Sequence, residues 1–587
     1  MKGYRLQVLG YSFLFVLLFT VTYPLSTAHA TVDPLAVPNN KFGIHIITAS
    51  PDESSPAAKL VNTNGDWGYI TVLIESKDRN ENKWQEFFND LRRRHLIPIV
   101  RLATKPVNEH WERPYEKEYE AWADFLDRLN WPTKNRYVTI YNEPNHGKEW
   151  GNFADPVSYA RVLNNTIDAL KQKSPDFFVM NAGFDASAPH LPPQYFDEVL
   201  FLKEMDKTVP GIFNKLDGWV SHSYPNPGFV GSLNASGRGT VRGFAWELQQ
   251  LRSLGVTKNL PVFITETGWV HAEGINYNSR YPGADVVAQY YKQAFENTWA
   301  DSQIVAITPF LLNYQEPPFD HFSFKKITGE GQNTRILGAA YPDYYPQYQT
   351  IMDMAKTTGR PVQENKAELT KGEVYSSIVA GESYNISLTF KNTGQSIWNE
   401  QVTLKAISGG KELGIEDVSV NEQVLSFGNK SVEPGQEYTF NINLKAPDKG
   451  AFKVKLNLFE REKEFDSKPV EFKTEVKLPV ILQILSKLKW KDNSAGEYIL
   501  KVSGVVGESS QAVTLNSSGK SPEIEARYLL PNYGFDFTLE KPYYHPKTIH
   551  KEVKSGVNNL DFGALQPALL PALLHPRELW QLLPWSK

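Results

Sequence analysis

Residues 138–145 read VTIYNEPN, and the organisation of the chain as far as Pro361 follows from this stretch. Its first four residues are β-branched or aromatic and predict a short strand, which a polar turn containing proline ends. The turn begins with an amide, Asn142, and a carboxylate, Glu143. In a barrel of parallel strands, catalytic groups lie at this end of each strand. A single Asn-Glu-Pro turn is also typical of a solvated strand end, so the interpretation depends on a second element.

That second element is residues 260–269, which read LPVFITETGW. This hydrophobic run also ends on a carboxylate, Glu266, which is followed by Gly268 and Trp269. The two glutamates lie 123 residues apart, about the length of three strand–helix units of a barrel. The spacing predicts Glu143 after a fourth strand and Glu266 after a seventh, facing each other across the mouth of the barrel. Two carboxylates across a cleft are what cleavage of a glycosidic bond requires.

Strand-like segments alternate with amphipathic helical segments over residues 38–358. Helical periodicity is clear, for example, at 83–95, 115–129 and 156–172. Eight such alternations predict a (β/α)8 TIM barrel. The expected strands cover residues 42–46, 69–74, 97–102, 138–141, 177–182, 218–222, 262–265 and 305–310.

The remainder of the chain predicts a multidomain protein with β-rich domains after the barrel. Beyond a linker at 361–366, apolar and polar residues alternate strictly, which predicts an immunoglobulin-like β-sandwich over 367–478. We expect this domain to be a spacer rather than a sugar-binding module, because a fold alone carries no function. Residues 479–565 hold further short strands and resemble the small prealbumin-like modules of exported bacterial proteins. Residues 566–587 form an apolar tail rich in leucine and proline, without a calcium-loop sequence.

Residues 1–30 have the features of a secretory signal peptide. Lys2 and Arg5 precede a mostly apolar stretch, and Ala-His-Ala at 28–30 is a small-x-small cleavage site. An uncleaved membrane anchor is the alternative, because the apolar stretch approaches spanning length. The protein is therefore expected to be secreted or held at the cell surface, without membrane contact beyond this segment.

The amino-acid composition excludes several classes of partner and of catalytic site. The formal charge is only −4 over 587 residues, without a basic stretch, which argues against a nucleic-acid partner. Cysteine is absent, which excludes thiolate metal sites and cysteine nucleophiles. Aromatic residues make up 13% of the chain and include 14 tryptophans, which mildly favours sugar binding. We expect a monomer that needs no cofactor and has a carbohydrate substrate.

The two motifs, at 141–145 and 264–269, resemble the acid/base and nucleophile signatures of retaining TIM-barrel glycoside hydrolases (clan A). The likeness is closest to the family 39-like enzymes, which include β-xylosidases and bacterial exopolysaccharide endoglycosidases, and next to family 5 cellulase-like enzymes. It covers residues 38–358 and is not specific for a substrate sugar. It implies an exported hydrolase that cleaves O-glycosidic bonds of a poly- or oligosaccharide by double displacement, with Glu143 as acid/base and Glu266 as nucleophile.

The resemblance also implies roles for neighbouring residues. Asn142 would bind the 2-hydroxyl of the sugar being cleaved, and either His222 or Tyr224, at the end of the sixth strand, would orient the nucleophile. Arg101, at the end of the third strand, could hold the nucleophile ionised, since arginine stays charged. An ion pair between Arg101 and Glu75 is the alternative.

Other strand ends supply weaker candidates. Trp150, Trp269 and Phe310 could stack on sugar rings. His45 is expected to contact substrate or to pack. Where the superfamily often has a tryptophan after the eighth strand, this chain has Phe310, Asn313 and Tyr314.

Two other function classes are alternatives. A metal-dependent barrel hydrolase would need clustered ligands such as His-x-His or H-E-x-x-H, which the sequence lacks, so no metal site is expected. A surface glycan-binding protein with an inactive barrel is the stronger alternative, although the presence of both glutamates favours an enzyme.

Overall fold

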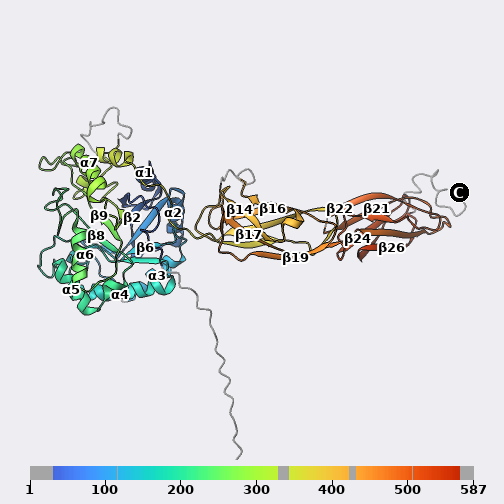
Figure 1. The fold of residues 1–587 in the computed structure, drawn as a ribbon, viewed down its shortest axis with the longest axis horizontal. Coiled ribbons are helices and arrows are strands. Elements are labelled where there is room, and N and C mark those ends of the chain that lie inside the picture. The colour runs from blue at the N-terminus through green and yellow to red at the C-terminus, as the bar shows by residue number, and fades with distance from the viewer. Residues whose placement is uncertain (1–30, 116, 328–342, 422–430, 506, 569–587) are drawn as a thin grey trace, which may run out of the picture. The chain divides into compact units, whose positions relative to one another are not determined.

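The computed structural model describes residues 31–115, 117–327, 343–421, 431–505 and 507–568. The chain folds as two units, which divide between Val362 and Gln363. The predicted signal peptide (1–30) and residues 569–587 of the predicted tail lie outside the described residues. In the first unit, helices surround a group of strands, whereas the second unit consists mainly of strands (Figure 1).

Eight parallel strands form the centre of the first unit. Most are short and almost continuously apolar, which is typical of strands buried on both faces. All of β1 and all of β9, for example, are buried. The eight strands are β1 (Gly43–Ile46), β2 (Gly68–Glu75), β3 (Leu96–Ala103), β6 (Arg136–Thr139), β7 (Phe177–Met180), β8 (Trp219–His222), β9 (Val262–Glu266) and β10 (Ile304–Ile307).

Hydrogen bonding closes these strands into a ring. One sheet has the order β1-β2-β3-β6-β7 and the other β10-β9-β8, with parallel pairing throughout. Single parallel bridges join the two sheets at both edges, from Phe42 to Ile307 and from Met180 to Gly218. The carboxyl ends of all eight strands therefore lie on one side of the ring, where the register pairs His222 with Glu266.

One α-helix follows each of these strands along the chain. The sequence explains where several begin, because Asn80, Asp155 and Asp197 each accept a hydrogen bond from the backbone N–H three residues further on. The main hydrophobic core contains buried residues of both the strands and the helices. The helices are α1 (Pro51–Asn62), α2 (Glu81–Arg93), α3 (Glu118–Arg128), α4 (Pro156–Lys173), α5 (Glu198–Thr208), α6 (Gly243–Ser253), α7 (Ala284–Gln293) and α8 (Pro346–Asp353).

A separate cluster of large side chains fills the inside of the ring. Tyr69, Tyr137, Phe178 and Phe263 belong to it and come from four different strands. Side chains alternate between the two faces of a strand, and neighbours such as Ile70 pack in the outer core, so these rings point inward. They close the ring beneath the carboxyl ends of the strands. A cavity that continues into the ring can therefore open only on the side of these carboxyl ends.

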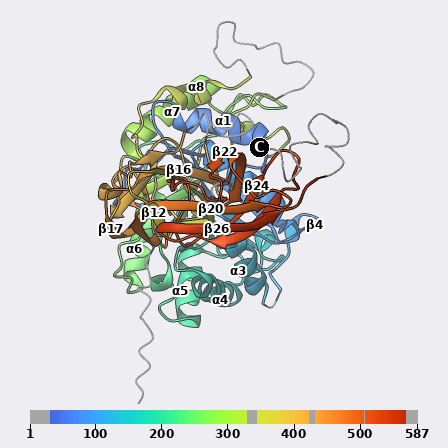
Figure 2. The same ribbon diagram turned by 90° about the vertical axis from the view of Figure 1, so that its right-hand side faces the viewer.

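The second unit contains two β-rich cores. The first lies within the sheets β11-β13-β16 and β12-β19-β17-β14-β15, with β18 beside β17, and the expected alternation of burial is clear in β16. The second lies within the sheets β23-β20-β26 and β22-β21-β24-β25. Figure 2 shows β20 and β26 side by side, as their parallel pairing requires. Tyr375 and Tyr384 pack against both cores.

The strands of the first core are β11 (Ala367–Gly372), β12 (Ser377–Val379), β13 (Ser383–Asn392), β14 (Val402–Ser408), β15 (Val418–Ser419), β16 (Glu437–Lys445), β17 (Gly450–Glu460), β18 (Lys463–Glu464) and β19 (Val470–Lys477). Those of the second are β20 (Val480–Leu488), β21 (Gly496–Gly504), β22 (Gly507–Leu515), β23 (Ile524–Ala526), β24 (Gly534–Glu540), β25 (Lys547–Glu552) and β26 (Gly556–Leu565).

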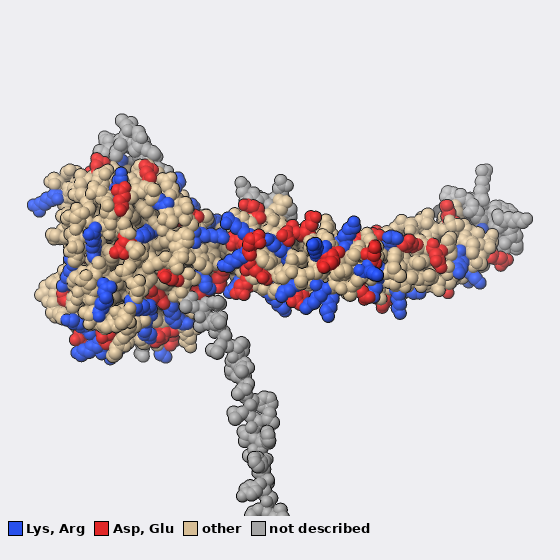
Figure 3. Space-filling model, in the orientation of Figure 1, with Lys and Arg blue, Asp and Glu red and all other residues tan. Residues whose placement is uncertain are grey.

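Charged side chains of both signs are interspersed on the face of each unit that Figure 3 shows. Within the described residues, no helix is long and apolar enough to cross a membrane.

Candidate active site

A cavity of about 450 Å³ opens at the carboxyl ends of the strands. Seven of the residues singled out in the sequence for catalysis or sugar contact line it. Phe310 is one, and the six polar ones are Glu143, Glu266, Asn142, Arg101, His222 and Tyr224. These six come from the ends of β3, β6, β8 and β9 or from the loops directly after these strands. The parallel ring therefore brings together side chains that are up to 165 residues apart in sequence.

The backbone after β6 aims Glu143 into this cavity. Tyr141 and Glu143 both have positive φ angles, of 68° and 29°, which side chains other than glycine rarely adopt. The N–H of Glu143 donates to the carbonyl of Gly183 at 3.0 Å, which anchors the turn to the loop after β7. Unusual backbone of this kind concentrates at functional sites, where the surrounding structure holds it in place.

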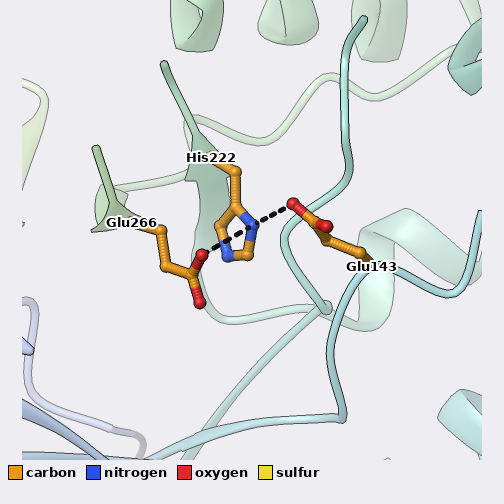
Figure 4. A group of neighbouring side chains, drawn as sticks. All are labelled: Glu143, His222 and Glu266. Carbon is orange, nitrogen blue, oxygen red and sulfur yellow. Dashed lines mark hydrogen bonds and ion pairs between the residues drawn. The ribbon is translucent and has the colours of Figure 1, made fainter. Parts of the chain in front are cut away.

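Two histidines flank the carboxyl group of Glu143. Its Oε1 lies 2.8 Å from Nδ1 of His222, and its Oε2 lies 4.0 Å from Nδ1 of His146. The other ring nitrogen of His146 lies 2.7 Å from Oδ2 of Asp185, which fixes the ring. Figure 4 shows the His222 ring between Glu143 and Glu266.

Glu266 is surrounded by positive charge and hydrogen-bond donors. Arg101 Nη1 donates to its Oε1 at 2.6 Å, and the Tyr224 hydroxyl donates to its Oε2 at 3.1 Å. His222 Nδ1 and His45 Nε2 each lie 3.8 Å from one of its oxygens. Burial by itself raises the pKa of Glu266, but the charges of His222 and Arg101 outweigh burial and lower the pKa below its ordinary value. Glu266 is therefore ionised near neutral pH.

The pKa values of the three side chains around Glu266 are also shifted by their surroundings. Burial disfavours the charged form of His222, but Glu266 and the hydrogen bond to Glu143 raise its pKa overall. Burial and then Arg101 lower the pKa of His45 to about 3, so this ring is neutral. Burial, followed by the charge of Glu266, raises the pKa of Tyr224 well above its usual range, so its hydroxyl remains a donor.

The carboxyl groups of Glu143 and Glu266 lie close together. Ligand atoms of Glu143, His222 and Glu266 are all within 4.8 Å of one another. Three such groups could in principle hold a cation. However, Arg101 already donates to one oxygen of Glu266, and Nδ1 of His222 already contacts Oε1 of Glu143. The donor set therefore fits proton transfer and nucleophilic attack better than metal binding.

The structure corrects four of the expected sugar contacts. Trp150 and Trp269 are both only 1% exposed, and neither lines the cavity. Trp150 packs against Tyr141, and the indole N–H of Trp269 donates to the carbonyl of Gly231. The prediction that these two rings stack on sugar is therefore wrong.

His45 is fully buried beneath Glu266 and packs against the ring of Phe310. A direct contact of His45 with substrate is therefore excluded, and packing is its observed role. Asn313 does not line the cavity and instead accepts a hydrogen bond from Gln315. Phe310 and Tyr314, by contrast, do line it.

No protein-family model matches the chain, and no curated protein sequence does. Among solved structures, a family 39 glycoside hydrolase from Bacteroides cellulosilyticus shares 13% identity over 71% of this chain and 82% of its own, with a TM-score of 0.36. An endo-β-1,3-glucanase of family 128 from Sorangium cellulosum (12% identity, 54% and 98%, TM-score 0.33) and a family 30 xylanase from Clostridium acetobutylicum (12%, 70% and 98%, 0.32) are also similar. Many of the similar structures are clan A glycoside hydrolases, the superfamily that the two motifs resemble. Because these identities and TM-scores are low, the function of this chain has to be inferred from the geometry of its own site.

Several residues that line the cavity were not predicted from the sequence. Trp111 lies on a hairpin formed by β4 (Pro106–Val107) and β5 (His110–Trp111), between β3 and α3, and lines the cavity. Further aromatic side chains line it from loops after β8 and β10, namely Phe229, Phe319 and Phe322. The apolar rings and the carboxyl groups together make a cavity suited to a ligand with both hydroxyl groups and apolar C–H faces.

Gly183 is a further residue on which the site depends. A Cβ at this position would lie 2.1 Å from Cδ2 of His222. Gly183→Ala should therefore displace the His222 ring and break its 2.8 Å contact with Glu143. We expect activity to fall about 100-fold, as is usual when a catalytic group moves by an ångström.

Gly243→Ala is the matched control, because its Cβ would lie 3.4 Å from Oγ of Ser223, close to an ordinary contact distance. Steady-state kinetics of both variants on one glycoside test the prediction. Equal activity in the two variants would show that the position of His222 is unimportant.

Proposed function

We propose that this protein is a retaining glycoside hydrolase that cleaves O-glycosidic bonds of a poly- or oligosaccharide. The observation that carries the proposal is the facing pair of carboxyl groups in the cavity, with oxygens within 4.8 Å of each other. In retaining enzymes the two carboxyl groups lie about 5–5.5 Å apart, whereas inverting enzymes leave about 6.5–9.5 Å for a water molecule. The short separation favours the retaining mechanism.

The two glutamates differ in their surroundings, and this supports their separate roles. Glu266 is held ionised by Arg101 and His222 and would attack the anomeric carbon. Glu143 would give its proton to the departing glycosidic oxygen, which leaves a covalent glycosyl-enzyme on Glu266. Glu143 would then take a proton from a water molecule, whose oxygen attacks the anomeric carbon and releases Glu266.

The proposal includes the architecture and location of the protein. The closed ring of eight parallel strands with eight following helices supports a (β/α)8 barrel of the glycosidase kind, covering residues 38–358. The two facing sheets after the barrel support an immunoglobulin-like sandwich over residues 367–478. The sequence of residues 1–30 supports export to the cell exterior.

Hydrolysis of a panel of β-glucans, xylans, mannans and bacterial exopolysaccharides, with and without EDTA, tests the proposal. We expect reducing sugar to be released from at least one glycan, with no loss of activity in EDTA. Proton NMR of the first product should show the anomeric configuration of the substrate. Initial release of the opposite anomer would contradict retention, and binding of a glycan without hydrolysis would identify an inactive glycan-binding protein.

A further inference from the structure

Glu149 is a third carboxyl group in the cavity, to which the reaction described above gives no role. It ends the short 3-10 turn Gly147–Glu149, which lies in the loop between β6 and α4. Its side chain lines the main cavity and also a small hollow behind Asn142, next to Trp111.

A continuous chain of hydrogen bonds joins Glu149 to the proposed nucleophile. Asn142 Nδ2 donates to Glu149 Oε2 at 3.2 Å. Arg101 Nη1 donates both to Asn142 Oδ1, at 2.8 Å, and to Glu266 Oε1, at 2.6 Å. Glu149 therefore contacts Glu266 indirectly, through one amide and one guanidinium group.

The chemistry of these groups determines which way the Asn142 amide faces. Arginine is only a donor, so Asn142 has to present its oxygen to Arg101 and its NH₂ group to the opposite side. A carboxyl group offers an acceptor oxygen whether or not it is protonated, so Glu149 can receive this NH₂ group in either state. Without Glu149, one of the two hydrogen bonds that hold the amide would be lost.

We propose that Glu149 is a positioning residue, which holds the Asn142 amide against Arg101 and thereby fixes the guanidinium group on the nucleophile Glu266. This inference rests on the proposed function of the site, because it concerns the same two catalytic glutamates. It assigns Glu149 no contact with the reacting atoms.

Electrostatics adds a pH dependence to this geometry. Burial, followed by the charge of Glu143, raises the pKa of Glu149 to about 7, although Arg101 and the hydrogen bond from Asn142 oppose the rise. Glu143, His146, Arg101 and Glu266 are the charged or titratable groups that act on it, and Glu75 lines the same cavity.

Ionisation of Glu149 near neutral pH should strengthen its hydrogen bond with Asn142. The charged carboxylate binds the Asn142 N–H more strongly, because charge-assisted hydrogen bonds are stronger than neutral ones. The Asn142 amide should therefore be held more firmly against Arg101 as the pH rises through the pKa of Glu149.

Kinetics of two variants separate the hydrogen bond from the charge. Glu149→Ala removes both, and we expect kcat to fall about 10- to 100-fold with little change in KM, as for a displaced catalytic group. Glu149→Gln keeps an acceptor oxygen but no charge, so kcat at low pH should stay near that of the wild type. The kcat of Glu149→Gln should fall below that of the wild type as the pH rises through about 7, where the wild-type carboxylate becomes charged and binds Asn142 more strongly. An unchanged kcat in Glu149→Ala would overturn the proposal.

Glu109→Gln is the matched control. Glu109 has an 87% exposed side chain that pairs with Lys148, the neighbour of Glu149, and it does not line the cavity. The Glu109→Gln substitution should leave both kcat and the pH profile unchanged. A shift of equal size in this variant would attribute the effect to general surface charge.

A second measurement does not depend on activity. Denaturant unfolding of Glu149→Ala, Asn142→Ala and the double variant should give strongly non-additive stability losses, because the two residues share one contact. The pH dependence of stability gives a further readout. A carboxyl group whose pKa is raised in the folded state contributes less to the free energy of unfolding as the pH rises above its pKa in the unfolded chain. The wild type should therefore lose stability relative to Glu149→Gln between about pH 4.5 and 7.

The kinetic and the unfolding measurements together distinguish failure of this inference from failure of the proposed function. Additive stability losses would show that Glu149 does not act through Asn142, whatever the activity. Non-additive losses in a protein that hydrolyses no glycan would show that the contact exists and that the proposed function is wrong.

Discussion

Glu266→Ala is expected to abolish turnover on every substrate, by a factor of about 10⁵ or more, because it removes the group that forms the covalent bond. Glu143→Ala should behave differently. An aryl glycoside with a good leaving group needs little protonation, so its first step should survive and the glycosyl-enzyme should accumulate on Glu266. The expected result is a burst of phenol release followed by slow turnover, with a mass increase of one glycosyl group on the protein.

Azide should rescue the Glu143→Ala variant, because this anion attacks the anomeric carbon without a general base. The product should be a glycosyl azide with the configuration of the substrate. If Glu266→Ala instead gave the azide of retained configuration and Glu143→Ala gave the inverted azide, the two roles would be exchanged. Full activity in both variants would exclude the proposed reaction, and Glu109→Gln controls for loss of an unrelated carboxylate.

Arg101→Met is expected to cost both activity and stability. Arg101 and Glu266 have side chains that are only 13% and 10% exposed, and their ion pair is 2.6 Å long. Removing one partner of a buried ion pair typically costs about 3–5 kcal/mol. Loss of this donor should also lower kcat about 100- to 1000-fold.

The pH dependence of the Arg101→Met variant follows from the lowered pKa of Glu266. In the wild type, a carboxyl group with a lowered pKa stabilises the folded state above its unfolded pKa, and this stability is lost as the pH falls. The stability gap between wild type and variant should therefore close below about pH 4.5. The acid limb of the pH–rate profile should move to higher pH, because Glu266 ionises less readily without the guanidinium group.

Arg113→Met is a suitable control for this prediction. Arg113 pairs with Asp155 at 3.1 Å, but its side chain is 37% exposed. Such surface pairs contribute about 0–1 kcal/mol. Chemical denaturation of both variants at several pH values makes the comparison. An equal loss of stability in the two would contradict the role of Arg101, beside His222, in holding Glu266 ionised.

Local patterns were sufficient to predict the strands and the two glutamates that meet at their carboxyl ends. The expected strand at 69–74 lies within β2, and that at 262–265 lies within β9, because buried parallel strands appear in sequence as short apolar runs. The two glutamates were predicted to meet because each follows such a run, and the carboxyl ends of parallel strands share one side of the ring. Periodicity and spacing carry this information without knowledge of the packing.

The partners of each side chain required the tertiary structure. The sequence left Arg101 with two possible carboxylates, and only the folded chain shows that it bonds Glu266 rather than Glu75. His222 and Tyr224 were equivalent candidates, but the structure places the histidine on Glu143 and the tyrosine on Glu266. Such choices depend on side-chain directions across strands, which are far apart in sequence.

The aromatic residues also show the difference between what the sequence predicts and what only the tertiary structure reveals. Trp269 lies three residues after Glu266 in sequence, yet its side chain is buried in the core. Trp111, outside both motifs, reaches the cavity from a hairpin. The sequence by itself determined the ring of strands and which carboxylates stand at its open end, because both follow from periodicity along the chain. Tertiary structure alone decided which side chains face the cavity, because that depends on how loops from different strands pack around the ring.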